Sequence, residues 1–132
     1  MVFKHNLKVY YEDTDMAGIV YYANYLKFAE RGRSDAVRDM GIDQNQMKTE
    51  GLVFAVKSVQ ADYHVPARFG DELLVETETS KIGGASLEMT QRVLRADTLI
   101  FTGVFRVACM ALSGKATRFP ADIRQKLQDS MR

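Results

Sequence analysis

Hydrophobic and polar residues alternate along most of this chain, and one long segment with a helical period interrupts the alternation. In residues 24–40, apolar positions recur every three or four residues, as on one face of a helix. That face holds Leu26, Ala29, Arg33, Ala36, Val37 and Met40. Asn24 is suited to cap the start of the helix, and Gly41 is suited to end it. At 1.5 Å per residue the helix would be about 25 Å long.

A period of two dominates the second half of the chain and predicts four long strands, at residues 52–63, 71–82, 85–96 and 98–112. Short turn sequences separate them, which favours antiparallel neighbours. A further strand is predicted before the long helix, a polar connection after it and a short helix at the end of the chain, over residues 3–11, 43–50 and 120–131 respectively.

These elements predict an α+β domain in two layers, in which a curved antiparallel sheet of about five strands wraps around the long central helix. No repeat, linker or low-complexity tract divides the chain, so residues 1–132 are expected to form a single domain. A single sheet layer leaves strand edges and one face uncovered. Homo-oligomerisation through the sheet is therefore expected.

Composition narrows the functional classes. Apolar residues make up 46% and charged residues 27% of the chain, and the formal net charge is +1. A general nucleic-acid-binding surface is not indicated, and no apolar segment approaches the roughly 20 residues of a membrane span. The single Cys109 and two histidines argue against a metal site. A cytoplasmic protein without metal is expected.

Candidate chemistry lies where the helix begins. Asp13 and Asp15 precede a turn that contains Gly18, and the turn leads to a helix start with unsatisfied N–H groups. Such donors stabilise the negative charge that develops on a carbonyl oxygen, and a carboxylate can activate water or attack directly. The alternative is that both aspartates only cap a turn.

Three other features have structural interpretations beside functional ones. Glu30 and Arg33 fall on the apolar helix face and are expected to be paired, in a wet cleft or at a subunit contact. His64, close to a proline turn, fits a surface histidine better than a catalytic one. The small residues Gly83, Gly84, Ala85 and Ser86 are not a nucleotide fingerprint, but they could let a phosphate approach backbone amides.

Taken together, the motif YYEDTDMAGIVYYANYLKFAERGR at residues 10–33 resembles the signature of hot-dog-fold acyl-CoA thioesterases related to 4-hydroxybenzoyl-CoA thioesterase. It looks especially like the branch associated with the bacterial Tol-Pal system. The segment from Tyr63 to Asp71 resembles the family's next strand turn, and the resemblance extends over about residues 5–115. It implies a hot-dog fold.

The resemblance also implies roles for individual residues. Asp15 takes the position of the catalytic carboxylate, as nucleophile or general base, and the backbone N–H of Tyr22 takes the position that polarises the thioester carbonyl. Many members of the Tol-Pal-associated branch have His at the position of Tyr22. The backbone N–H of this residue is a donor with either side chain. Gly18, Tyr25 and the hairpin of Gly83, Gly84, Ala85 and Ser86 are the implied substrate contacts. Lys115 or Arg118 is a candidate for holding the CoA phosphates, across a subunit boundary.

The leading hypothesis is a homo-oligomeric acyl-CoA thioesterase, expected to be a tetramer, which needs no cofactor because CoA is part of the substrate. In an alternative mechanism Glu30 is the catalytic carboxylate. A different class of protein is an adaptor that binds acyl-CoA or acyl carrier protein with little turnover. A dehydratase of the same fold is a third hypothesis. It is disfavoured because such enzymes generally use a histidine and a carboxylate, and neither His5 nor His64 lies in the motif.

Overall fold

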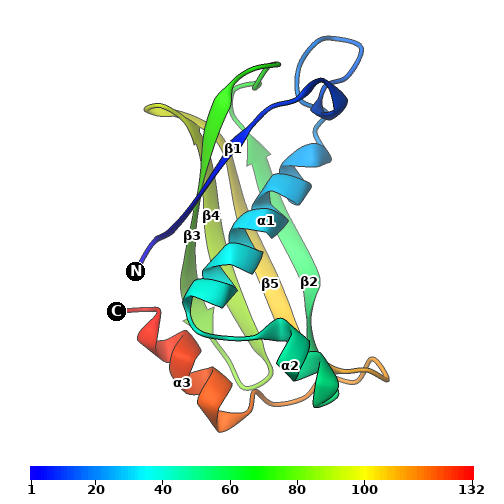
Figure 1. The fold of residues 1–132 in the computed structure, drawn as a ribbon, viewed down its shortest axis with the longest axis vertical. Helices are drawn as coiled ribbons and strands as arrows, with labels where there is room; N and C mark the ends of the chain where they lie inside the picture. Colours follow the sequence, from blue (N-terminus) through cyan, green and yellow to red (C-terminus); the bar gives the residue numbers. More distant parts are fainter.

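The computed structural model describes all 132 residues as a five-stranded sheet with three α-helices (Figure 1). The elements are β1 (Phe3–Lys8), α1 (Asn24–Asp39), α2 (Gln44–Thr49), β2 (Leu52–Tyr63), β3 (Glu72–Ile82), β4 (Ser86–Arg95), β5 (Thr98–Ala111) and α3 (Ala121–Asp129). The strand order is β1-β3-β4-β5-β2, and every pair of neighbours is antiparallel. The predicted architecture is confirmed.

Helix α1 lies across one face of the curved sheet and packs mainly against β1 and β3 (Figure 1). The apolar stripe of the helix meets the inward residues of the strands, and together they form one hydrophobic core. Gly32 sits at the closest approach, because a Cβ there would lie 2.6 Å from Cγ1 of Val75. The helix and sheet can touch only because this position has no side chain.

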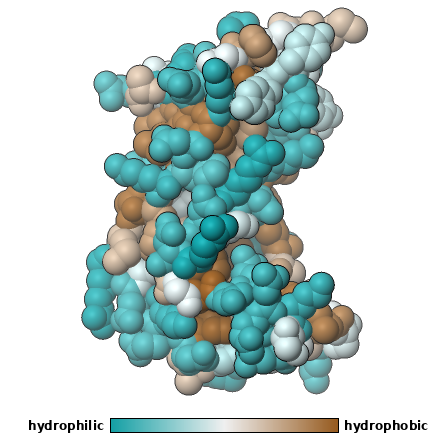
Figure 2. All heavy atoms as spheres, in the orientation of Figure 1, coloured by the Kyte–Doolittle hydropathy of each residue, from teal (hydrophilic) through white to brown (hydrophobic).

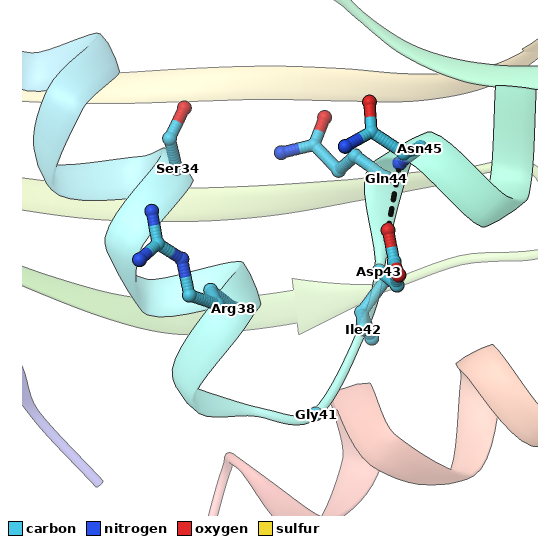
Figure 3. Close-up of a pocket in the computed structure, with 7 residues that line it drawn as sticks. All are labelled: Ser34, Arg38, Gly41, Ile42, Asp43, Gln44 and Asn45. Atoms are coloured by element: carbon cyan, nitrogen blue, oxygen red, sulfur yellow. Dashed lines mark hydrogen bonds between the residues drawn. The ribbon is translucent and has the colours of Figure 1, made fainter.

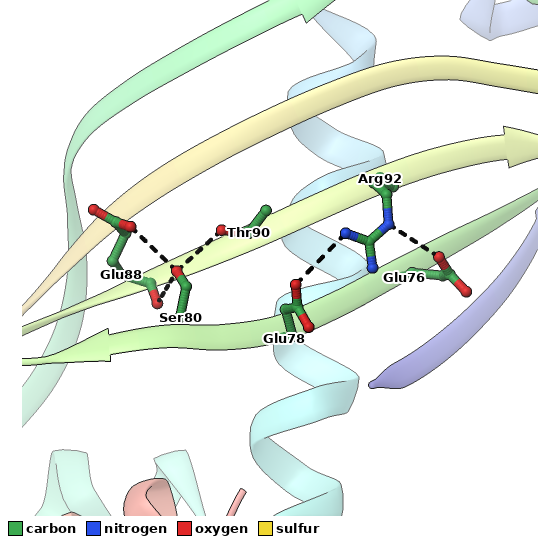
Figure 4. A network of polar contacts seen from close by, with 6 residues as sticks. All are labelled: Glu76, Glu78, Ser80, Glu88, Thr90 and Arg92. Carbon is green, nitrogen blue, oxygen red and sulfur yellow. Dashed lines mark hydrogen bonds and ion pairs between the residues drawn. The ribbon is translucent and has the colours of Figure 1, made fainter. Parts of the chain in front are cut away.

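The outer face of the sheet carries two polar networks between β3 and β4. Arg92 of β4 pairs with Glu76 and Glu78 of β3, at N–O distances of 3.2 and 3.5 Å (Figure 4). On the same face, the Ser80 hydroxyl contacts Glu88 and Thr90 in a second small network, also drawn in Figure 4. Cross-strand ion pairs and hydrogen bonds therefore link β3 and β4 on this face.

Strand β2 ends the sheet and has no strand on its outer edge. Its residues Val56 and Val59 pair in register with the buried Val107 and Phe105 of β5, yet they are 48% and 42% exposed. Apolar atoms also remain visible among polar side chains on the face that carries α1 (Figure 2). The side of the core next to β2 is thus incompletely covered within one chain.

Three local predictions were wrong. The first strand ends at Lys8, because the chain turns into a short 3-10 helix at Tyr11–Asp13. The connection after α1 contains α2, whose first amides are capped by the Asp43 carboxylate. Asn24 is the first residue of α1 and not its cap, since its side-chain amide donates to the carbonyl of Asp13 at 2.9 Å.

The buried face of α1 includes Ala29, Ala36 and Val37 as predicted, but its other members differ from the prediction. Tyr25, Phe28 and Gly32 are buried, whereas Leu26 is 37% exposed. Glu30 faces solvent, so it does not share the buried arc as expected. The buried face was predicted mainly from aliphatic residues, whereas aromatic residues and a glycine make the closest contacts with the sheet.

Candidate active site

The two aspartates before α1 have different environments. Asp13 is 9% exposed, and its carboxylate accepts a hydrogen bond from the Tyr10 amide at 2.8 Å. Its carbonyl accepts from the Tyr21 amide at 3.0 Å and from the side chain of Asn24. Asp13 therefore holds the turn and the helix start together, which is the structural role considered for the pair.

Asp15 keeps part of its carboxylate free. It is exposed, and Oδ1 accepts from the Ala17 amide at 2.9 Å, while Oδ2 has no hydrogen bond within the chain. Its backbone is fixed by bonds with Ile19 and Gly18 at 2.9 and 3.0 Å. Gly18 closes this turn at a φ of 78°, which other residues rarely adopt. The carboxylate is thus oriented, with one oxygen available.

Backbone N–H groups at the start of α1 lack an acceptor in the protein, among them those of Tyr22 and Ala23. The amides of Tyr21 and Asn24 are bonded to the carbonyls of Asp13 and Tyr21, but those of Tyr22 and Ala23 are not bonded. The cap residue Ala23 has no side chain that could satisfy them. Unpaired donors at a helix N-terminus attract negative charge.

Asp15 and Tyr22 line one cavity of about 340 Å³, which is mostly apolar. The lining residues are Asp15, Ile19, Val20, Tyr22, Tyr25, Tyr63, His64, Val65 and Pro66. Asp15 is the only carboxylate among them. The cavity therefore combines an oriented carboxylate, a residue with a free amide and apolar walls, which is the arrangement that acyl transfer requires.

Aromatic rings form the walls of this cavity. Tyr25 is 3% exposed and stacks on Phe101 with a centroid distance of 5.4 Å. Its hydroxyl accepts from the Ala67 amide at 3.0 Å, and burial raises its pKa. Tyr63 meets Tyr25 and Tyr22 edge to face, at 5.6 and 6.2 Å. Tyr25 was expected near the substrate, whereas Tyr63 was recognised only as part of a turn motif.

The loop between β2 and β3 holds the turn at Asp15 against the sheet. The Val20 amide donates to the Ala67 carbonyl at 2.8 Å. Asp71 supports this loop, because its carboxylate accepts from the Arg68 amide at 2.9 Å and from Arg95 at 2.7 Å. Burial acts to raise the pKa of Asp71, but these two donors outweigh it and lower that pKa.

Other predicted site residues lie elsewhere in the chain. Glu30 lies in a separate surface cleft beside Leu26, Lys27 and Arg31. The hairpin of Gly83, Gly84, Ala85 and Ser86 lies at the opposite end of the sheet from the turn at Asp15 (Figure 1). One chain therefore does not bring these residues to the cavity.

The hairpin is nevertheless surrounded by cations from the end of the chain. Arg124 donates to the carbonyls of Gly83 and Gly84 at 2.7 and 3.0 Å. A Cβ at Gly84 would lie 3.3 Å from the guanidinium of Arg118. Sequence reasoning missed Arg124, because a residue of a terminal helix gives no local signal that it contacts a hairpin 40 residues earlier.

The two histidines and a second, larger cleft do not form a competing centre. His5 contacts Asp35, and His64 contacts the hydroxyl of Thr102 at 3.0 Å. The larger cleft, of about 530 Å³, is polar and lies between the end of α1 and the start of α2 (Figure 3). Its one carboxylate, Asp43, already accepts from the amides that start α2. No group of three or more potential metal-ligating side chains occurs, and no helix is long and apolar enough to cross a membrane.

Known proteins share both the sequence and this fold. The model of the thioesterase-like superfamily matches residues 9–127. The acyl-CoA thioesterase YbgC of Haemophilus influenzae is 39% identical over 124 residues, which cover 92% of this chain and 91% of that protein. The 1,4-dihydroxy-2-naphthoyl-CoA hydrolase of Nostoc punctiforme is 28% identical and covers all of this chain and 90% of its own length. A probable thioesterase from Bartonella henselae has a TM-score of 0.82 and 34% identity, covering 90% of this chain and 98% of its own.

Proposed function

Because this chain belongs to the thioesterase-like superfamily and has the hot-dog fold, we propose that it is an acyl-CoA thioesterase in which Asp15 is the catalytic carboxylate. The reaction is hydrolysis of R–CO–S–CoA to a free acid and CoA. One observation carries the assignment of the site. Asp15, which has a free carboxylate oxygen, and Tyr22, which has an unpaired amide, line the same apolar cavity.

The thioester carbonyl would lie with its oxygen toward the Tyr22 amide. Negative charge develops on that oxygen as the tetrahedral intermediate forms, and a fixed donor stabilises it; removing one such donor typically costs about 3 kcal/mol. Asp15 either removes a proton from the attacking water or attacks the carbonyl itself. In both routes the C–S bond breaks and CoA leaves as a thiolate. In the second route, water then hydrolyses the anhydride between the acyl group and Asp15, which releases the acid and restores the carboxylate.

The walls of the cavity favour an uncharged acyl group. Apart from Asp15, the lining consists of aliphatic and aromatic side chains with His64 at its margin. Burying a second charge there would be unfavourable without a partner. The relatives named for acyl-CoA and for an aromatic acyl-CoA support this class of substrate, in which either an aliphatic or an aromatic acyl group would fit.

A second copy of the chain is the partner that we propose for the open side of the core. Arg33 is half-buried, stacks 4.2 Å over Phe105 and donates to Gln91, but it makes no ion pair within its chain. Burial lowers its pKa, and only the charge of Glu30 opposes this. The exposed Glu30 carboxylate of a second copy would complement Arg33, and the free edge of β2 lies on the same side.

Such an oligomer would also explain the position of the hairpin. Gly83 and Gly84 lie too far from Asp15 to serve the same active site, so with Arg118 beside them they would hold the CoA phosphates of a neighbouring chain. Light scattering tests the oligomer, and a monomer that is fully active would contradict it. The tetrameric state and the cytoplasmic location stay predictions.

The test of the function is release of free thiol from short-chain, long-chain and aromatic acyl-CoAs by the wild type and by Asp15→Asn. We expect hydrolysis of at least one class and a loss of about 10³-fold in the variant, because the carboxylate acts in the chemical step. Asp39→Asn is the matched control, since this exposed helix residue forms no side-chain hydrogen bond or ion pair.

Glu30→Gln distinguishes the alternative mechanism. An active Glu30→Gln beside an inactive Asp15→Asn supports the proposal, and the reverse result would transfer the chemistry to Glu30. Binding of acyl-CoA with no thiol release from any substrate would instead indicate an adaptor, with acyl carrier protein as the next ligand to test.

A further inference from the structure

Tyr63 makes a hydrogen bond that its place in the aromatic wall does not require. It is the last residue of β2, and its hydroxyl donates to the carbonyl of Tyr22 at 3.1 Å. The ring is 47% exposed, so the bond links the sheet to the start of α1 at the edge of the cavity. Burial, followed by the neighbouring Tyr22, raises the pKa of the Tyr63 phenol, so the hydroxyl remains a donor at neutral pH.

The acceptor of this bond belongs to the peptide group that carries the Ala23 N–H. Because a peptide group is planar, fixing the direction of the Tyr22 carbonyl also fixes the direction of the Ala23 N–H. A hydrogen bond to the carbonyl polarises the group and makes its N–H a better donor. That N–H has no acceptor in the protein, and it follows directly on the free amide of Tyr22.

We propose that Tyr63 is a positioning residue, which holds the peptide between Tyr22 and Ala23 so that the Ala23 N–H is a second donor to the thioester carbonyl oxygen. This inference rests on the proposed thioesterase function. Residue 23 is helical, with φ −68° and ψ −22°, so its N–H lies at the start of α1, and it follows directly on Tyr22, which lines the cavity. The two amides would then share the charge on one oxygen.

Ring packing is the competing explanation, and the two explanations predict different kinetics. The ring of Tyr63 lies 5.3 Å from that of Phe101 and also contacts Tyr25, so it could serve only as a wall of the cavity. A wall acts on substrate binding and therefore on KM. A residue that orients an oxyanion donor acts on kcat, because the charge exists only in the transition state.

The test compares Tyr63→Phe with the wild type on the best acyl-CoA substrate. The variant keeps the ring and loses only the hydroxyl. We expect kcat to fall about tenfold, less than the 10²- to 10³-fold that follows loss of a direct donor, with KM changed by less than about twofold. Tyr11→Phe is the matched control, because Tyr11 is 83% exposed and its hydroxyl makes no hydrogen bond. An unchanged kcat, or a rise in KM alone, would overturn the proposal.

A second readout does not depend on turnover. In NMR spectra the Ala23 amide proton should move upfield in Tyr63→Phe and stay in place in Tyr11→Phe, because the polarising bond is lost only in the first. An unmoved Ala23 resonance contradicts the positioning role. If the wild type releases no thiol, the thioesterase proposal fails separately, while this measurement still decides whether Tyr63 orients the peptide.

Discussion

The middle and the beginning of α1 use the same backbone in opposite ways. In the middle, Gly32 brings the helix against the sheet, and the buried amide of Gln91 donates to the carbonyl of Ala29 and to Thr77, both at 2.8 Å. At the beginning, the N–H groups of Tyr22 and Ala23 have no partner in the protein. The buried middle of α1 satisfies its polar groups within the protein, whereas the accessible beginning leaves donors for a ligand.

This difference follows from access to water. An unpaired donor buried in the middle of the helix would cost about 1–3 kcal/mol, whereas donors at an accessible end can be hydrated and cost little. Tyr22 is 61% exposed, while Gln91 is fully buried. Substitutions in the middle should therefore change the free energy of unfolding, and substitutions at the beginning should change the chemistry.

The largest change in stability is expected for Gly32→Val. The first added carbon alone would lie 2.6 Å from Val75 and 3.1 Å from the Thr77 hydroxyl, so helix and sheet must separate. We expect a loss of about 3 kcal/mol, measured by urea unfolding. Arg31→Val, at the neighbouring exposed position, should cost about 0.5 kcal/mol. Equal losses in the two variants would refute the close-packing explanation.

The fold could be predicted well from the sequence because its strands have a long and regular periodicity. Long runs of period two, bounded by turn residues, fixed strand β2 at residues 52–63 as predicted. Errors occurred where a local hydrogen bond decided the structure. The Asp13 carboxylate ended the first strand early by accepting from Tyr10, and Asp43 nucleated α2 in a segment with one buried side chain, Met47.

The site was less predictable than the fold, because its parts come from different elements. The motif places Asp15 and Tyr22 together in one turn, and the structure joins them in one cavity. Tyr63 reaches that cavity only through the pairing of β2 with β5, which no local pattern reveals. Which of the two aspartates is free depends on burial, and spacing alone cannot distinguish them.

A smaller loss of stability is expected when the buried Gln91 side chain, which bonds to the middle of α1, is replaced. Gln91→Leu leaves the partners of its side-chain amide and the donor of Arg33 without their bonds. The expected cost is about 2 kcal/mol in urea unfolding, with thiol release per folded molecule nearly unchanged. Gln60→Leu on the exposed side of β2 is the matched control and should be nearly neutral. A Gln91→Leu protein of full stability would show that the network does not hold helix to sheet.

The turn before α1 holds two carboxylates, Asp13 and Asp15, whose roles are expected to differ. Asp13→Ala removes the acceptor for the Tyr10 amide and should cost about 1 kcal/mol, as loss of a cap does, while most thiol release remains. Asp15→Ala should have little effect on unfolding and abolish thiol release. If Asp13→Ala instead lost activity at full stability, the assignment of structural and chemical roles would be reversed.

The smallest effect concerns the loop that fastens the turn, and it depends on pH. Since the Arg68 amide and Arg95 lower the pKa of Asp71 in the folded protein, Asp71 contributes stability above its unfolded pKa of 3.8. That contribution is lost as the pH falls through the lower folded value. Asp71→Asn should therefore be less stable than the wild type at pH 7 and close to it at about pH 2 in urea unfolding. The side chains of Asp71 and Arg95 are 23% and 34% exposed, so solvent screening keeps the difference small. The control Asp39→Asn should have nearly the same free energy of unfolding as the wild type at both pH values. If Asp71→Asn were still less stable than the wild type at about pH 2, the carboxylate would stabilise the loop without its charge.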